Sequence, residues 1–251
     1  MIRRTHAIVL RAIPYSETSQ IVTLFTELYG KETVMARGSR RQKSRFGSAL
    51  QPMSFVEIVY YFKAGRNVQT LSEAAHVKRF DNLSRDLEKI ALGLSMVELL
   101  NALVQDADQQ PGLFALAVDA LARLDAAHEY PQNVRAYFQV RMAQELGFSP
   151  AFTRDEVETL PDDGGVFMLS DGSIAEGGIG SRGSDGAVRA SRSALRALAV
   201  LALAPPEVMQ RMRLTDPVRN EVDALITGFL RYHVEQSYPT RAERVVRQLI
   251  G

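Results

Sequence analysis

The amino-acid sequence predicts an α+β protein of two parts, a five-stranded β-barrel over residues 1–80 and an α-helical part over residues 81–251. In short runs before Phe80, apolar residues alternate with polar ones, as they do in half-buried strands. After Phe80 the apolar residues recur at three- and four-residue spacing, as they do on helix faces. One segment, residues 147–190, holds nine of the 17 glycines and interrupts the helical pattern, which predicts a loop or β-hairpin insertion.

Five short strands are expected in the first part. Pro14 ends the first of them, and Gly30 lies in the turn after the second, where a positive φ is expected. Closure into a barrel is favoured over an open sheet because closure leaves no exposed edges. The five strands are expected over residues 5–13, 20–27, 32–36, 55–63 and 68–75.

Helix-start signals mark the second part. Ser84 is a candidate N-cap for its first helix, and Asp216 followed by Pro217 is typical of another helix start. Thr240 with Glu243 forms a capping-box pattern that predicts a final helix over residues 241–250. The remaining helices are expected over residues 113–124, 134–146 and 194–204.

Positive charge is concentrated in residues 36–50, which read ARGSRRQKSRFGSAL. Residues 1–80 hold 13 Lys and Arg against 5 Asp and Glu, although the whole chain has a net charge of only +1. Lysine and arginine neutralise phosphates and release condensed counterions, so the segment favours a nucleic-acid site over an ordinary solvated loop. Its basic residues, with no acid between them, are Arg37, Arg40, Arg41, Lys43 and Arg45.

Three aromatic side chains near this segment are candidates for base stacking. Tyr61 is expected on the outward face of its strand, Phe46 lies within the segment, and Tyr15 belongs to the first loop. For Tyr61 and Phe46, packing against the barrel or the helical part is the competing interpretation.

Other kinds of site find no support in the sequence. The absence of cysteine excludes disulfides, thiol nucleophiles and cysteine-ligated zinc, and it suits a reducing cytoplasm. No apolar stretch approaches the eighteen residues of a membrane span. The four histidines follow no metal-ligand spacing, and the G-x-G-x-x-G match at residues 178–183 lacks the flanking strand and helix that a dinucleotide site needs. The sequence therefore predicts no catalytic residue, no metal and no cofactor, and so a protein that is not an enzyme.

The N-terminal part resembles the RecO family of bacterial recombination mediators. The likeness is carried in order by residues 7–11 (AIVLR), 15–19 (YSETS), 24–30 (LFTELYG), 36–40 (ARGSR), 50–52 (LQP) and 71–74 (LSEA). It implies an N-terminal OB-fold followed by an α-helical domain. It also implies a role in DNA recombination and the DNA damage response: binding of single- and double-stranded DNA, annealing of complementary strands, and loading of RecA onto strands coated by single-stranded-DNA-binding protein.

The same resemblance implies protein partners and a location. RecR is the usual partner, and the acidic, hydrophobic C-terminal tail of the single-stranded-DNA-binding protein is another, docking on the helical domain. The protein is expected in the cytoplasm, associated with the nucleoid. The DNA-binding role is transferred to the five basic residues of the segment. The basic helix faces that fit the tail, with solvated helix surface as the alternative, are Arg192 with Arg196, and Arg241, Arg244 and Arg247.

The chain departs from the family in one respect. Many members carry a four-cysteine zinc module where this chain has residues 147–190, with no cysteine and no histidine. Zinc is therefore not expected, and either the loop is loose or hairpin hydrogen bonds and packing replace the metal. The candidates for that packing are Val166, Phe167, Met168 and Leu169.

Two other functions stay open from the residues alone. One is an RNA-binding OB-fold protein associated with the ribosome, which matched DNA and RNA competitors would separate because only RNA offers 2′-hydroxyls. The other is an adaptor whose basic loop docks an acidic protein partner.

Overall fold

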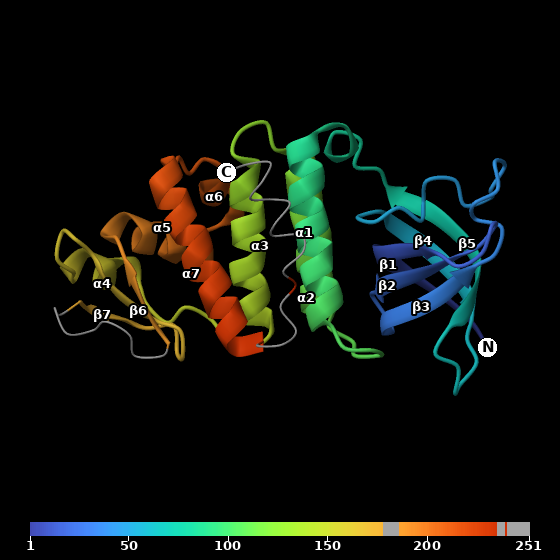
Figure 1. Ribbon diagram of the computed structural model, residues 1–251, viewed down its shortest axis with the longest axis horizontal. Coiled ribbons are helices and arrows are strands. Elements are labelled where there is room, and N and C mark those ends of the chain that lie inside the picture. The colour runs from blue at the N-terminus through green and yellow to red at the C-terminus, as the bar shows by residue number, and fades with distance from the viewer. Residues whose placement is uncertain (178–185, 235–238, 240–251) are drawn as a thin grey trace. The chain divides into compact units, whose positions relative to one another are not determined.

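The computed structural model describes residues 1–177, 186–234 and 239. The chain divides into two compact units at Ala126 and Ala127. The first unit contains the barrel and two helices, and the second contains the remaining helices with a small sheet (Figure 1). Within the described ranges, no helix has the length and apolar character needed to cross a bilayer.

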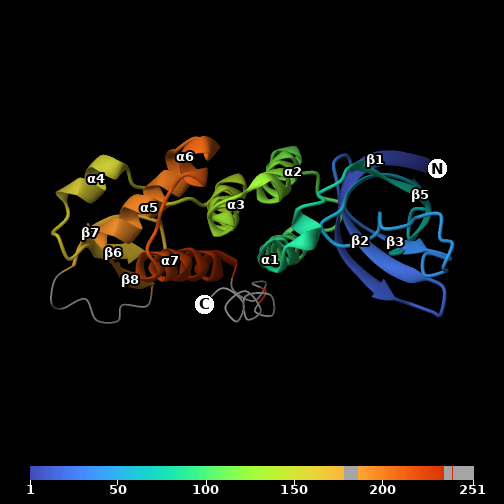
Figure 2. The ribbon, with the colours of Figure 1, turned by 90° about the horizontal axis from the view of Figure 1, so that it is seen from above.

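The five predicted strands are present and close into a barrel in the order β1-β2-β3-β5-β4 (Figure 2). β1 is antiparallel to both β2 and β4, and a short parallel pairing of Val34 with Gln69 and of Met35 with Thr70 joins β3 to β5. This is the strand order of an OB-fold. Gly30 has the expected positive φ, 67°. The strands are β1 (Ile2–Pro14), β2 (Gln20–Thr26), β3 (Gly30–Ala36), β4 (Phe55–Tyr61) and β5 (Gln69–Lys78).

The barrel interior is filled by alternate strand residues, such as Val34, Ile58 and Tyr60, and is closed by the connection between β3 and β4. From this connection, Phe46, Ala49 and Leu50 enter the core. Phe46 is only 3% exposed, so the interpretation that it stacks on bases is wrong and the competing interpretation, packing, is confirmed. Residues 37–45, the basic segment, are thus followed directly by a buried anchor.

Part of the outer barrel surface is covered by α1 (Leu87–Leu103) and α2 (Pro111–Ala126). The ring of Phe114 on α2 lies 5.5 Å from the ring of Phe25 and 6.3 Å from that of Phe55. These edge-on aromatic contacts bury outward-facing residues of β2 and β4. The first compact unit therefore continues beyond residue 80, where the secondary structure changes from strands to helices.

Asp86, not Ser84, caps α1. The Asp86 carboxylate accepts hydrogen bonds from the backbone N–H groups of Glu88 and Lys89, at 2.9 and 3.1 Å. Ser84 instead lies in the short 3-10 helix η1 (Leu83–Arg85). Both residue types are good caps, and the 3-10 turn places the aspartate at the first free N–H groups of the helix.

A carboxylate, Glu32, is held at the barrel wall with little access to water. Arg3 Nη1 lies 3.1 Å from Glu32 Oε1, and the Tyr60 hydroxyl donates to the same oxygen at 3.2 Å. The Glu32 side chain is only 11% exposed. Burial raises the pKa of Glu32 above its usual value and outweighs the lowering by Tyr60 and Arg3.

We expect Glu32→Gln to remove a pH dependence of stability. A carboxyl group whose pKa is raised in the folded state stabilises most when protonated, so its contribution falls as pH rises from about 4.5 through the folded-state pKa. The free energy of unfolding of the variant, minus that of the wild type, should therefore increase from pH 4 to pH 7. Denaturant titrations at each pH measure this difference, and a constant difference would contradict the prediction.

The second unit is built around α3 (Pro131–Glu145), which contacts α5 (Arg192–Leu203), α6 (Pro206–Gln210) and α7 (Asp216–Val234). The predicted helices over residues 113–124, 134–146 and 194–204 correspond to α2, α3 and α5, within three residues at each end. Buried Asn133 ties α3 to the end of α6, because its amide nitrogen donates to the carbonyls of Met209 and Met212 at 3.0 and 2.8 Å.

The insertion predicted at residues 147–190 forms a short helix and a three-stranded antiparallel sheet of order β7-β6-β8. Gly164 precedes this sheet with φ 96°, and a Cβ there would collide with the carbonyl of Ala190, so the turn requires glycine. The elements are α4 (Arg154–Thr159), β6 (Gly165–Met168), β7 (Ile174–Glu176) and β8 (Ala187–Ala190). The G-x-G-x-x-G match, the capping box at Thr240 and the final helix predicted over residues 241–250 lie outside the described residues.

Candidate nucleic-acid interface

The basic segment is the first part of the connection between β3 and β4. Its five cationic side chains are all exposed. Among the residues that the structure describes, none of the five forms an ion pair with a carboxylate. Their positive charge is therefore available to an anion from outside the molecule. The five are Arg37, Arg40, Arg41, Lys43 and Arg45.

Arg40 holds the segment against the loop between β1 and β2. Its backbone N–H donates to the carbonyl of Thr18 at 3.1 Å, and its Nη1 donates to the carbonyl of Ser16 at 2.7 Å. At the far end, the Arg45 guanidinium lies 4.9 Å from the centre of the Phe46 ring, whose burial anchors the chain. The segment is therefore fixed at both ends, while its other cations project into solvent.

The strand register brings a third loop to this end of the barrel. Thr70, at the start of β5, is paired with Met35 near the end of β3 and with Tyr61 at the end of β4. The loop between β4 and β5 therefore begins close to where the basic segment begins. It carries Lys63 and Arg66, both exposed and without an ion pair in the described part of the chain.

Gln69 fixes the shape of this third loop. Its side chain is buried, and its amide nitrogen donates to the carbonyls of Lys63 and Arg66 at 3.3 and 2.7 Å. Its amide oxygen accepts from the backbone N–H of Lys63 at 2.8 Å. The sequence alone does not assign Lys63 and Arg66 to the site, because only the pairing of β3 with β5 brings them there.

Exposed apolar side chains lie beside these cations. Tyr61 faces outward as predicted and is 53% exposed, next to Ile2 in the register of β1 with β4. Tyr15, in the loop that Arg40 contacts, is 66% exposed. Ile13, near the end of β1 from which this loop leaves, is also exposed. Aromatic rings next to cations on an OB-fold are the arrangement that binds single-stranded nucleic acid.

The charge at this end of the barrel is almost entirely positive. The connecting loops over residues 15–19, 37–54 and 62–68 contain seven Lys and Arg side chains and one carboxylate, Glu17. Such a concentration of one sign attracts a polyanion over distances of about 10 Å at 0.1 M salt.

The arginines of α5 differ from the cations of the barrel loops because they have carboxylate partners. Arg192 Nη1 lies 2.9 Å from Asp162, and Arg196 forms a two-pronged ion pair with Glu158. The helix face carrying Arg192 and Arg196 is therefore largely neutralised by carboxylates of the insertion. Arg241, Arg244 and Arg247 lie outside the described residues.

The acids of the insertion serve local structure. Asp163 pairs with Arg189 at 3.3 Å, and Asp171 accepts hydrogen bonds from the backbone N–H and hydroxyl of Ser173. No three metal-ligating side chains come together in the described ranges of the chain.

Comparisons with known proteins agree with this geometry. Residues 1–80 match the family model "Recombination protein O N terminal", and residues 84–242 match "Recombination protein O C terminal". A protein of Salinibacter ruber named DNA repair protein RecO is 47% identical over 250 residues, covering 99% of this chain and 94% of the relative. A protein of the same name from Chloroherpeton thalassium is 29% identical over the full length of both chains. One from an Exiguobacterium species is 34% identical over 153 residues, covering 61% of this chain and 60% of the relative.

Proposed function

Because the chain belongs to the RecO family of DNA repair proteins, we propose that it is a recombination mediator that binds single- and double-stranded DNA at the basic segment and anneals complementary strands. The observation that carries this proposal is the set of five exposed cations on an OB-fold that have no carboxylate partner among the described residues. In this proposal, residues 1–80 form the nucleic-acid-binding domain and residues 81–251 the helical domain that binds protein partners.

Annealing follows from charge neutralisation. The five cations of the basic segment, joined by Lys63 and Arg66, contact phosphates of one strand while Tyr61 stacks on an unpaired base. With part of its charge neutralised, this strand repels a second strand less, and complementary bases pair. No covalent bond is made or broken, so no catalytic residue is required. Neither matching family description names a catalytic activity.

The proposal includes the partners that the family implies. With RecR, the protein loads RecA onto strands that are coated by single-stranded-DNA-binding protein, in the nucleoid region of the cytoplasm. It reaches coated strands by binding the acidic, hydrophobic C-terminal tail of the coating protein. Such a tail requires an apolar surface bordered by positive charge.

A groove of about 380 Å³ in the second unit has these properties, and we propose it as the site of the tail. Arg154 and Arg196 share the carboxylate of Glu158, whereas Arg213 is exposed and forms no ion pair with any described residue. The apolar lining of the groove is Ala197, Val200, Met212, Leu214 and Val218, and the arginines beside it are Arg154, Arg196 and Arg213.

One annealing experiment tests both the proposed function and the proposed tail site. Complementary strands are mixed either naked or precoated with single-stranded-DNA-binding protein, with and without RecR. The wild type should accelerate annealing of both, whereas Arg213→Glu should anneal naked strands normally and coated strands about tenfold more slowly, as expected for the loss of one charge-assisted contact and the repulsion that replaces it. Arg211→Glu, an exposed arginine outside the groove, is the matched control.

The outcomes separate the two proposals. Failure of the wild type to anneal naked strands would contradict the proposed function itself. Equal rates for Arg213→Glu and Arg211→Glu on coated strands would contradict only the tail site. Binding of an acidic peptide without binding of any oligonucleotide at low salt would favour the adaptor function instead.

A further inference from the structure

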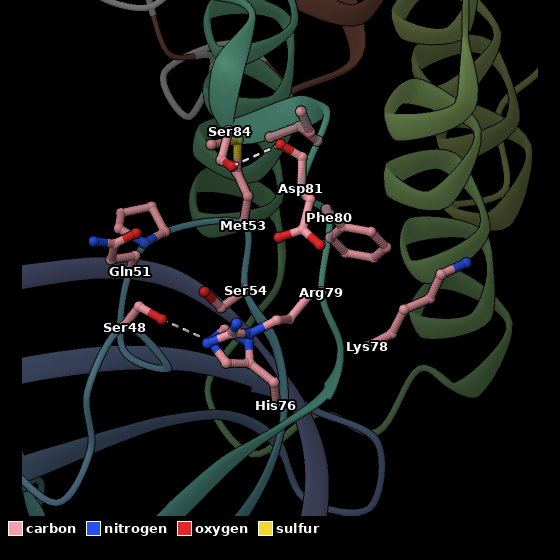
Figure 3. Close-up of a pocket in the computed structure, with 12 residues that line it drawn as sticks. Ser48, Gln51, Met53, Ser54, His76, Lys78, Arg79, Phe80, Asp81 and Ser84 are labelled. Atoms are coloured by element: carbon pink, nitrogen blue, oxygen red, sulfur yellow. Dashed lines mark hydrogen bonds between the residues drawn. The ribbon is translucent and has the colours of Figure 1, made fainter.

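A second candidate site lies in the first unit, beyond the basic segment. The same connection between β3 and β4 continues through Phe46 and Leu50, which are buried in the barrel core, and so turns Ser48 and Gln51 outward. These side chains line a pocket of about 250 Å³, together with residues at and after the end of β5 (Figure 3).

The pocket wall on the β5 side contains His76 and Arg79. Ser48 Oγ lies 3.1 Å from His76 Nε2 and holds the imidazole in place. Burial lowers the pKa of His76, helped by the nearby Arg79, so the ring is neutral at pH 7. Figure 3 shows the Arg79 side chain reaching over His76, whereas the Lys78 chain extends away from it. Arg79 is therefore the cation that faces an occupant of the pocket.

The remaining lining offers chemistry that a bare phosphate would not need. Asp81 and Gln51 provide hydrogen-bond acceptors, and Gln51 also provides a donor. Met53 and Phe80 provide apolar surface. Donors, acceptors and apolar surface around a small volume match the edge and face of a nucleobase. The Asp81 carboxylate beside the pocket disfavours a free anion such as phosphate, which has no base edge to place against it.

The pocket is within reach of DNA held by the basic segment. Arg45 and Ser48 are three residues apart, so their Cα atoms lie no more than about 11 Å from each other. This distance is the span of only a few nucleotides of a strand. A strand that contacts Arg45 can therefore place a nearby nucleotide at Ser48 and Arg79 without leaving the surface of the barrel.

We propose that this pocket receives one unpaired nucleotide of the bound single strand, with its phosphate on Arg79 and its base between Gln51, Asp81 and the apolar wall. The inference rests on the proposed DNA-binding function and deepens it. A base in the pocket is not available for Watson–Crick pairing, so the pocket recognises single-stranded DNA and not duplex. The basic segment, in contrast, contacts phosphates of either form.

The test is the ratio of two affinities, measured for the full chain by fluorescence anisotropy with a 20-nucleotide oligo-dT strand and with a 20-base-pair duplex. Arg79→Ala should weaken single-strand binding about tenfold and Gln51→Ala roughly threefold, as expected for losing a charge-assisted and a neutral hydrogen bond, while duplex binding changes less than twofold. Arg85→Ala, a nearby exposed arginine that does not line the pocket, is the charge-matched control. It should leave the ratio unchanged.

Two results would overturn the pocket. One is a parallel loss of single-strand and duplex affinity in Arg79→Ala, which would make Arg79 a general phosphate contact. The other is a loss of affinity in Gln51→Ala that is the same for oligo-dT and for an abasic strand of the same length. The base would then play no part in binding. Both results leave the proposed function standing, since that function depends on the basic segment and not on Arg79.

Discussion

Replacing the five cations of the basic segment by alanine should reduce the dependence of single-strand affinity on salt from a slope near −5 to a slope near −1.4. Each phosphate contact with a single strand contributes about −0.7 to the slope of log K against log salt concentration. The seven cations of the three loops give the first value, and Lys63 and Arg66 alone give the second; the contact proposed for Arg79 adds about −0.7 to both values. Annealing should be lost in this variant, because the few phosphate contacts that remain do not hold a strand at physiological salt.

The salt titration separates a lost contact from a damaged fold. The side chains of the segment are exposed and the anchor Phe46 is unchanged, so far-UV circular dichroism should be the same as for the wild type. Arg40 is the exception, since its guanidinium also holds the β1–β2 loop through the carbonyl of Ser16. A variant that retains Arg40 and loses the other four should give a slope near −2.1. A wild-type slope in the five-alanine variant would contradict the proposed interface.

The strand pattern predicted the barrel and the side of β4 that faces out. Alternation places Tyr60 inside and Tyr61 outside, and the structure confirms both positions. The positive φ at Gly30 was predictable because a tight turn between two strands requires it. These features follow from local periodicity and backbone sterics, which act over a few residues and are therefore visible in one sequence.

The features that the sequence did not predict depend on contacts between distant residues. Phe46 follows a run of cations, and nothing local distinguishes a ring that stacks on DNA from one that closes a barrel. Arg192 and Arg196 form a basic pair on a helix, but carboxylates at Asp162 and Glu158 neutralise them after the chain folds. Lys63 and Arg66 join the site only because β5 begins beside the end of β3.

Phe167→Ala should lower the free energy of unfolding of the second unit by about 3–5 kcal/mol. Phe167 on β6 has no solvent exposure, and its ring lies 6.0 Å from that of Phe152 and 5.5 Å from that of Phe229 on α7. Phe167 therefore joins the sheet to α7 through a buried aromatic contact. Truncation leaves a cavity that the short strands around it cannot fill by small shifts.

The large loss of stability expected for Phe167→Ala follows from the absence of cysteine in the insertion. Without cysteine, the segment cannot obtain the folding free energy that a structural zinc supplies, so packing has to stabilise it. A cluster of rings continues from Phe229 to His233 and Phe148, with centroids 4.6 and 4.5 Å apart. Phe167 connects the sheet to this cluster. For the same reason, a chelator should not change the midpoint of wild-type unfolding.

Urea denaturation followed by far-UV circular dichroism measures the change in a chain that has no tryptophan. Leu203→Ala truncates an exposed apolar side chain at the end of α5 and should cost less than about 0.5 kcal/mol, so it serves as the matched control. Phe167→Leu should lose less than Phe167→Ala, because leucine fills part of the cavity. Amide exchange should become faster in β6 and β8, while single-strand affinity stays unchanged, because the basic segment belongs to the first unit. Equal stability of the Phe167 and Leu203 alanine variants would show that the insertion is held by something other than this packing.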